Sequence, residues 1–262
     1  MKLMVLISCM HRTDTGIISE SNVQTDSVVV NQCDRDSIEE FDFKNKKGRT
    51  CHVKFINTTE RGLSNSRNMA ILNATNADIC YMCDDDEFLA DDYEDTIVSA
   101  YEKYPYKSII TFSLIRKDYT YPTKAQKMGI KQILKTSSVQ TTFRRDDILK
   151  CNIFFDPKMG SGSGNGGGEE NKFLMDCKRA GLKLWYVPQI IASVKTENSQ
   201  WFHGFTEDYY SNVSWANRRI LGKYLGALYM TYWVLFRRNN FKQELSFASI
   251  VRACLKGFFE ER

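Results

Sequence analysis

The sequence predicts an α/β protein whose central sheet is mostly parallel and is flanked by helices. Short apolar runs recur along the first three quarters of the chain, and segments with a helical spacing of apolar residues separate some of them. Because a helix can carry the chain back to the start of the next strand, this alternation favours parallel pairing. The expected strands are 3–9, 26–34, 51–57, 77–83, 108–115, 137–145 and 182–188, the last ended by Pro188, and the expected helices are 62–75, 91–103 and 169–181.

The composition is that of a globular protein with one large domain and a small C-terminal extension. Of the 262 residues, 42% are hydrophobic and 26% are charged, which allows a substantial buried core. The net charge of +4 is too small an excess to indicate nucleic-acid binding. We expect a domain over residues 1–205 and a helical, basic and aromatic extension over 206–262.

The cysteines and the N-terminus both favour a cytoplasmic protein. Several of the eight cysteines lie inside apolar runs, which indicates reduced thiols rather than a disulfide framework. Cys80 and Cys83 form a CxxC, but no second pair accompanies it, so we expect buried strand thiols. The first apolar run lacks the length and the cleavage site of a signal peptide and is expected to be a buried strand.

An apolar run from Ile220 to Phe236, broken only by Lys223, stands out in the C-terminal extension. Two arginines flank it on each side, and it is rich in tyrosine and tryptophan. It is slightly short for a spanning helix. A helix in the membrane interface, with cationic flanks on anionic lipid, is one interpretation. A helix hairpin packed on the domain, with the aromatic residues as core, is the other.

Three adjacent carboxylates, Asp84, Asp85 and Asp86, follow the apolar run at 77–83. Ligands of open α/β sheets bind outside the carboxyl ends of the strands, where these side chains are expected. Their mutual repulsion calls for a compensating charge, and oxygen donors suit Mg²⁺ or Mn²⁺. In an extended chain Asp84 and Asp86 project to the same side. The alternative is a solvated loop that begins the next helix.

Two further residues are expected at the same edge of the sheet. Arg67 lies in the first turns of the helix at 62–75, from where it could reach a phosphate, and helix starts also favour anions. Asp34, at the end of the second strand, could accept hydrogen bonds from a base or a ribose. One crevice would then hold a nucleotide, its diphosphate and a cation.

The stretch 159–171, MGSGSGNGGGEEN, contains many glycines and ends at an acidic pair, Glu169 and Glu170. Its composition is that of a flexible linker. The segments before and after it look packed, however, so we expect an ordered or ligand-ordered loop at an active site. The two acids could serve chemistry there, or could merely favour the helix N-terminus.

With GLSNSRN at 62–68, DDDE at 84–87, GEEN at 168–171 and the pair Asn31–Gln32, the chain resembles the family 2 glycosyltransferases with the GT-A fold. Among these it is most similar to bacterial enzymes that build capsule or O-antigen polysaccharide. The resemblance covers roughly residues 3 to 205. It implies a nucleotide-sugar donor, with a UDP-sugar favoured, and Mn²⁺ or Mg²⁺ as the cofactor.

The resemblance also assigns roles at the donor site, residue by residue. Asp86 becomes the metal ligand and Asp84 the sugar or ribose contact, with Asp85 beside them. Asp34 becomes the nucleotide-binding acid. Arg67 and Asn68 match the family's Arg-Asn pair.

The acidic pair that opens the helix at 169 takes the catalytic role that the resemblance implies. Glu170 would be the general base of an inverting transfer, although the family usually has aspartate there, and Glu169 is the alternative base or a hydrogen-bonding neighbour. His203 is either an additional metal or diphosphate ligand or an exposed or capping residue.

The implied acceptor is a polysaccharide or an oligosaccharide on a polyprenyl carrier, and the enzyme would sit at the cytosolic face of the inner membrane. Two alternatives remain open. A nucleotidyltransferase of similar fold would need a glycine-rich, lysine-bearing phosphate loop after the first strand, which the sequence lacks there. A non-catalytic membrane-associated partner would not need the acids at 84–86 and 169–170.

Overall fold

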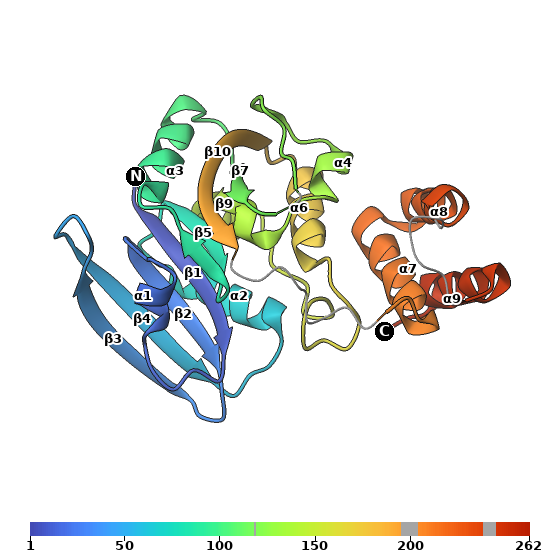
Figure 1. Ribbon diagram of the computed structural model, residues 1–262, viewed down its shortest axis with the longest axis horizontal. Coiled ribbons are helices and arrows are strands. Elements are labelled where there is room, and N and C mark those ends of the chain that lie inside the picture. Colours follow the sequence, from blue (N-terminus) through green and yellow to red (C-terminus); the bar gives the residue numbers. More distant parts are fainter. Residues whose placement is uncertain (118, 195–203, 238–244) are drawn as a thin grey trace.

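The computed structural model describes residues 1–117, 119–194, 204–237 and 245–262. Its centre is a mixed sheet in the order β3-β4-β2-β1-β5-β9-β7-β10-β6, with β8 paired to β10 (Figure 1). The strands are β1 (Leu3–Met10), β2 (Asp26–Gln32), β3 (Ser37–Lys44), β4 (Thr50–Thr58), β5 (Ile79–Asp84), β6 (Glu87–Leu89), β7 (Ile109–Ile115), β8 (Gln126–Lys127), β9 (Thr141–Arg144) and β10 (Leu184–Val194).

Most long strands run in one direction, as the sequence predicts. β4, β2, β1 and β5 pair in parallel, with Ser8 of β1 opposite Asp84 of β5. β7 and β10 are parallel to each other, and β9 joins them to β5 by antiparallel pairing on both sides. The carboxyl ends of six strands therefore meet at one edge of the sheet, where Asp84 ends β5.

Helices cover both faces of the sheet and enclose two apolar cores. Successive residues of β1 alternate between them: Val5 and Ile7 belong to one core and Leu6 to the other. The first core is covered by α1 (Ile17–Glu20) and α3 (Tyr93–Lys103). The second is covered by α2 (Leu63–Asn73), α4 (Ile130–Ile133), α5 (Arg145–Lys150) and α6 (Glu169–Arg179).

The elements β3, β6, β8, α1, α4 and α5 were not expected from the sequence, and three of the differences in the strands have identifiable reasons. β3 was not expected, because its charged side chains interrupt the apolar pattern that marks the other strands. It is an edge strand that pairs only with β4, where such side chains are common. β10 continues past Pro188 because its register with β7 is irregular between Tyr186 and Ile190, where a missing N–H is tolerated. The segment 137–145 forms a short 3₁₀ turn, η1 (Ser138–Gln140), before β9 begins.

The C-terminal part forms a group of helices beside α6 (Figure 1). They are α7 (Glu207–Leu221), α8 (Lys223–Tyr232), its π-helical continuation η2 (Trp233–Arg237) and α9 (Phe247–Phe259). The apolar run from Ile220 to Phe236 is not one helix, because Gly222 breaks it with a φ of 81°. Of the helices that the structure describes, none has the length and apolar character needed to cross a bilayer.

α7 contributes to two cores at once. Trp215 and Ile220 belong to the core that contains α6, whereas Tyr210 packs with Trp233 and α9 in a separate C-terminal cluster. Arg179 of α6 also donates to the carbonyl oxygen of Ile220 at 2.7 Å. The boundary predicted at 205/206 falls just before this shared helix.

Candidate active site

An acidic turn lies at the carboxyl edge of the sheet. β5 is buried along its length until Asp84, and Asp85 and Asp86 then turn the chain into β6. Glu87 stabilises this turn from the protein interior, since its Oε2 accepts a hydrogen bond from the backbone N–H of Asp84 at 3.1 Å. The three aspartates thus stand at the rim while the glutamate is completely buried.

Burial and neighbouring carboxylates raise the pKa values of two acidic groups in this turn, Asp85 and Glu87. Partial burial, and then the charges of Asp84 and Asp86, raise the pKa of Asp85. Burial, and then the charge of Asp84, raise the pKa of Glu87 well above its usual range. Oε1 of Glu87 has no hydrogen-bond partner among the described residues. A cation from outside the chain would offset the repulsion between these groups and favour their charged forms.

Arg67 connects this turn to a second acidic group. Its guanidinium is 1% exposed and donates from Nη2 to Oδ1 of Asp84 at 2.9 Å and from Nη1 to Oε1 of Glu169 at 2.8 Å. Burial alone lowers the pKa of Arg67, but Asp84 and Glu169 outweigh that effect and raise it. One buried cation thus holds together two carboxylates that are far apart in the sequence.

The acidic pair begins α6. Gly168, with a φ of 95°, precedes Glu169, which is buried against Arg67, and Glu170 follows on the next position of the helix. Burial first, then the adjacent Glu169 carboxylate, raise the pKa of Glu170 to about 8, while Arg67 acts in the opposite direction. A carboxyl group in this state holds its proton at neutral pH and becomes a stronger base than an ordinary carboxylate once it has lost that proton.

The glycine run is ordered by close backbone contacts. A Cβ on Gly162 would lie 3.2 Å from the Cα of Gly62, and one on Gly160 would lie 3.1 Å from the carboxyl carbon of Glu169. The N–H of Leu63 donates to the carbonyl oxygen of Ser161 at 2.9 Å. The run therefore contacts the start of α2 and the start of α6, and Gly160 and Gly162 are required by the protein's own packing.

Two predicted donor-site residues occupy positions that differ from the expectation. We expected Arg67 to reach a phosphate, but its terminal nitrogens are buried against Asp84 and Glu169. Asn68, its predicted companion, instead exchanges two hydrogen bonds of 2.8 Å with the backbone of Phe155. Both side chains hold the site together from within the protein.

Of the remaining predicted residues, Asp34 lies apart from this buried cluster. Asp34 follows β2 with its side chain 89% exposed and forms an ion pair of 2.6 Å with Arg61. His203 lies outside the described residues, as do its aromatic neighbours Trp201 and Phe202. The predicted roles of Asp34 and His203 stay predictions.

The chemistry of the acidic turn suits a hard divalent cation that shares its ligands with a substrate. Within the described ranges, no three His, Cys, Asp or Glu side chains are arranged to hold a metal ion on their own. Mg²⁺, however, is often bound by one or two carboxylates plus substrate phosphates, and the turn offers such carboxylates at Asp85 and Asp86. The residues present therefore fit a cation that is completed by a diphosphate.

Two functional neighbours were missed from the sequence. Ser138, in η1, lies with its Oγ 2.8 Å from Nη2 of Arg67 and 3.2 Å from Oδ2 of Asp84. No sequence signal marks it, because serine is common and its segment was expected to be a strand. Glu87 closes the DDDE motif, so its place beside the aspartates was a usable signal.

The fold and this pair of joined acidic groups define an α/β enzyme of the GT-A class. The chain belongs to glycosyl transferase family 2, whose family model matches residues 20–162, more than half of the chain. The protein is a glycosyltransferase. A search of curated protein sequences finds no match.

Solved structures share the architecture at low sequence identity. The structure of residues 1–349 of TarS from S. aureus is 13% identical, with a TM-score of 0.64, over 98% of this chain and 80% of that one. The same TarS fragment in complex with UDP-GlcNAc gives a TM-score of 0.66 at 13% identity, over 97% and 79% of the two chains. The mannosyltransferase PcManGT from Pyrobaculum calidifontis, in complex with GDP-Man and Mn²⁺, is 11% identical with a TM-score of 0.55, over 95% and 73%.

Proposed function

We propose that this enzyme is an inverting, metal-dependent glycosyltransferase of bacterial surface-polysaccharide synthesis, of the capsule or O-antigen type. It moves a sugar from a nucleotide-sugar, with UDP-sugars favoured, to a hydroxyl group of a lipid-linked or polysaccharide acceptor. The observation that carries the proposal is the double ion pair of Arg67, which joins the acidic turn to the acidic start of α6. Donor and base groups are thereby held as one unit.

Glu170 is the general base in this mechanism, and Glu169 positions it. The carboxylate of Glu169 is committed to Arg67 at 2.8 Å, whereas Glu170 has a pKa raised to about 8. Glu170 accepts the proton of the acceptor hydroxyl as the oxygen attacks the anomeric carbon. The bond from that carbon to the diphosphate breaks, and its electron pair leaves with the nucleoside diphosphate.

The remaining groups bind the donor. Asp84 contacts the sugar or ribose, Asp85 stands beside it, and Asp34 contacts the nucleoside. Mn²⁺ or Mg²⁺, held by Asp86 with the donor diphosphate and with His203 as an additional ligand, would supply positive charge for the leaving group. TarS with UDP-GlcNAc and PcManGT with GDP-Man and Mn²⁺ share this fold, which supports a nucleotide-sugar donor and a metal ion in general.

A thermal-shift panel of nucleotide-sugars tests the donor proposal. We expect one nucleotide-sugar to raise the melting temperature in the presence of Mn²⁺ and to have little effect without it. Asp86→Ala should abolish this shift, whereas Asp146→Ala, which removes a 74% exposed carboxylate on α5, should retain it. The absence of any Mn²⁺-dependent shift across the panel contradicts the proposal. The anomeric configuration of the product, read by NMR, decides inversion.

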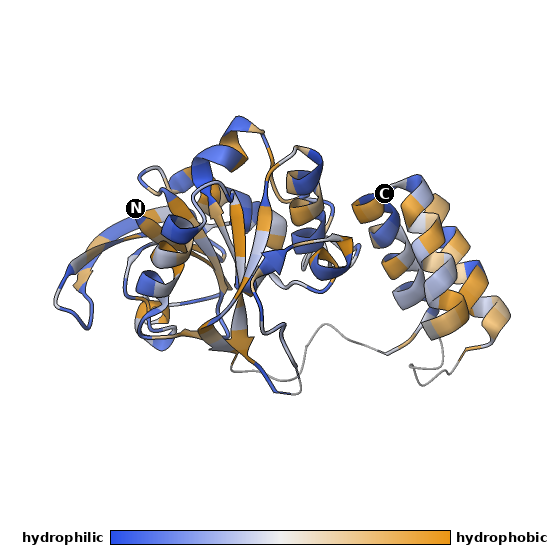
Figure 2. Ribbon diagram, turned by 90° about the horizontal axis from the view of Figure 1, so that it is seen from above, coloured by the Kyte–Doolittle hydropathy of each residue, from blue (hydrophilic) through white to orange (hydrophobic). Residues whose placement is uncertain are grey.

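We also propose that the C-terminal helices hold the enzyme on the cytosolic face of the inner membrane. α8 and η2 expose Leu228 (68%) and Phe236 (72%), and α9 exposes Leu255 (54%) and Phe259 (65%). Hydrophobic residues, drawn in orange, lie on the outer faces of these helices in Figure 2. This apolar face is unusually dense for a surface in contact only with water.

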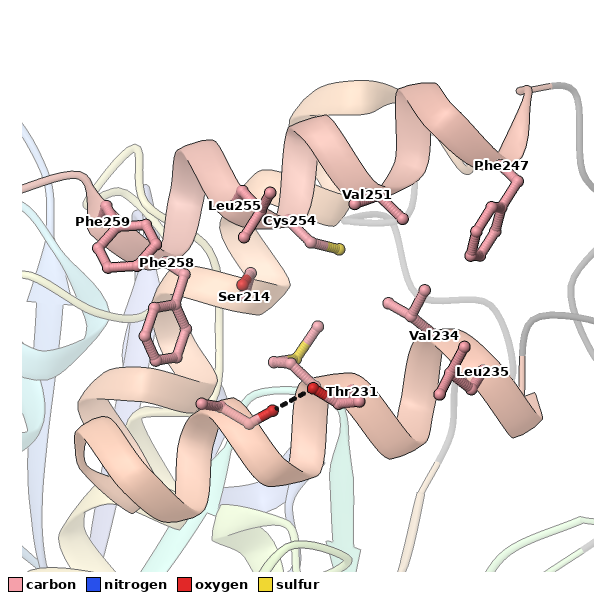
Figure 3. Close-up of a pocket in the computed structure, with 12 residues that line it drawn as sticks. Ser214, Thr231, Val234, Leu235, Phe247, Val251, Cys254, Leu255, Phe258 and Phe259 are labelled. Carbon is pink, nitrogen blue, oxygen red and sulfur yellow. Dashed lines mark hydrogen bonds between the residues drawn. The ribbon is translucent and has the colours of Figure 1, made fainter.

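A groove and a row of cations support a lipid partner. α8 with η2 and α9 face each other across an apolar groove of about 280 Å³, with Val234 on one side and Val251 and Cys254 on the other (Figure 3). On α9, the exposed Arg252 and Lys256 each follow an apolar residue of the groove by one position. This arrangement is typical of a helix that lies in the plane of an anionic membrane.

A further inference from the structure

A second pocket lies beside the candidate active site and has no role in the mechanism above. It has a volume of about 370 Å³ and lies between α4, the segment 119–122 and β10. The side chains that characterise it are Tyr119, Tyr121, Tyr186, Gln132, Lys131 and Lys135. It combines rings, an amide and two cations, a set of groups that suits a carbohydrate with a charged substituent.

The walls of this pocket are fastened to the residues of the active site. η1 faces both: Ser138 contacts Arg67 and Asp84, and Gln140, two positions on, lines the pocket. Asn171, which follows Glu170 on α6, donates to the carbonyl oxygens of Ile133 at 2.8 Å and Thr136 at 2.9 Å. The pocket is therefore fixed relative to the general base.

The aromatic side of the pocket is ordered. The rings of Tyr119 and Tyr121 lie 4.5 Å apart between centroids. The hydroxyl of Tyr186 donates to the carbonyl oxygen of Pro122 at 2.8 Å and lies 2.7 Å from Oγ of Ser113. Tyrosines held in this way offer rigid, amphipathic surface to a sugar ring at a low entropic cost.

The cationic side of the pocket is formed by two lysines, Lys131 and Lys135. Lys131 on α4 and Lys135 in the turn after it are both exposed and both line the pocket, so their like charges repel across it. Among the residues that the structure describes, neither lysine forms an ion pair, and no described lining residue is acidic. An anion bound between them would relieve their repulsion.

We propose that this pocket binds the acceptor glycan and that Lys131 and Lys135 recognise an anionic group on it, a carboxylate or a phosphate. The inference rests on the proposed glycosyl transfer and adds the acceptor's chemical class. Neutral glycans of the same length bind more weakly, because they leave both cations without a partner.

Calorimetric titration of defined glycans, with UDP and Mn²⁺ present, tests whether the acceptor is anionic. One arm compares a glucuronate-containing tetrasaccharide with its carboxyl-reduced form, and the other compares a phosphorylated maltotetraose with maltotetraose. We expect the anionic member of at least one pair to bind about tenfold more tightly to the wild type, a preference of the size that a few weak charge contacts provide. The arm that shows the preference identifies the anion.

Paired variants assign that preference to the pocket. Lys131→Gln/Lys135→Gln should lose it, while Lys44→Gln/Lys150→Gln, which removes the same charge from β3 and α5, should keep it. A preference that survives in Lys131→Gln/Lys135→Gln overturns the inference, as does equal or undetectable binding of both members in both arms. UDP binding with Mn²⁺ is titrated separately in each variant, so a failure of the proposed donor chemistry is recognised on its own.

Discussion

Nη1 of Arg67 lies 2.8 Å from Oε1 of Glu169, although 102 residues separate them in the sequence. The same guanidinium reaches Asp84 at 2.9 Å through Nη2. This contact distinguishes the two glutamates at the start of α6: one is neutralised by a buried cation and the other is left to titrate. This difference is the reason why Glu169 is assigned a positioning role and Glu170 the role of general base.

Glu170→Gln should lower kcat by about 10²–10⁴-fold, because the amide cannot accept the acceptor proton. The affinity for UDP with Mn²⁺ should change little, since Glu170 is not assigned to the donor. Steady-state kinetics and UDP titration measure the two effects. A Glu170→Gln enzyme that turns over at the wild-type rate would show that another group is the base.

The pH dependence of kcat should reflect the ionisation of Glu170. With its pKa raised to about 8, Glu170 is protonated below that pH and cannot act as a base, so kcat should rise as the pH increases through this value. The residual activity of Glu170→Gln should lack the inflection. A wild-type profile that is flat between pH 6 and 9 contradicts the assignment.

The stability of the fold should depend on pH in the opposite direction. The pKa of Glu170 in the folded state is above its ordinary value of 4.5, so the folded state binds the proton more tightly than the unfolded state. Its contribution to the free energy of unfolding is complete below that ordinary value and is lost as the pH rises through the folded pKa. Urea unfolding across this range should show a steeper decline for the wild type than for Glu170→Gln.

Arg67→Met should destabilise the protein by about 3–5 kcal/mol, the usual cost of leaving buried charges without a partner. Combining it with Glu169→Gln should recover part of this loss, because one of the two stranded carboxylates is then neutral. Urea unfolding of the wild type, both single variants and the double variant gives the coupling energy. Additive effects of the two substitutions would be inconsistent with the ion pair described above.

Gly162→Ala should destabilise the protein more than Gly164→Ala. Both glycines have positive φ, 84° and 76°, so both substitutions carry a backbone cost of about 1 kcal/mol. Only at Gly162 would the new Cβ approach the backbone of Gly62, at 3.2 Å, while nothing lies within 4 Å at Gly164. Equal melting temperatures for the two variants would argue against the close packing of this loop.

Leu228→Glu/Phe259→Glu should weaken binding to vesicles of phosphatidylglycerol and phosphatidylcholine, because both substitutions place charge on the apolar face of α8 and α9. Ile38→Glu on β3 is the control, since Ile38 is similarly exposed, at 60%, but lies far from this face in the sequence. Co-sedimentation measures the bound fraction. If the double variant bound the vesicles as well as the wild type does, these helices would not be the membrane-binding part of the enzyme.

The order of the main strands and of α2, α3 and α6 was predictable because the apolar periodicity of these segments is strong, whereas β3, β6, β8, α1, α4 and α5 were not expected. The acidic turn was placed correctly at the end of β5, since charged residues end a buried strand where the sheet meets solvent. The glycine run and the acidic pair were also recognised as one loop and one helix start. These are local signals that one segment of sequence can carry.

Contacts between distant segments could not be predicted from local pattern. Arg67 carries the same charge whether it faces a ligand phosphate or buried acids, and only the packing of α2 against α6 decides which. Asn68 and Ser138 have short polar side chains whose partners come from other segments, Phe155 and Asp84. The sequence allowed a helix hairpin here, but its break at Gly222 was not located, because the apolar run continues across that residue.

The position of α7 has a consequence for how the molecule melts. Since Trp215 and Tyr210 belong to two different cores, neither part can lose this helix without uncovering apolar surface in the other. Calorimetry should therefore show a single cooperative transition rather than two. A chain that stops at residue 205 would expose the apolar surface that Trp215 and Ile220 cover, and one that stops at Gly222 would expose the face of α7 that packs on α9.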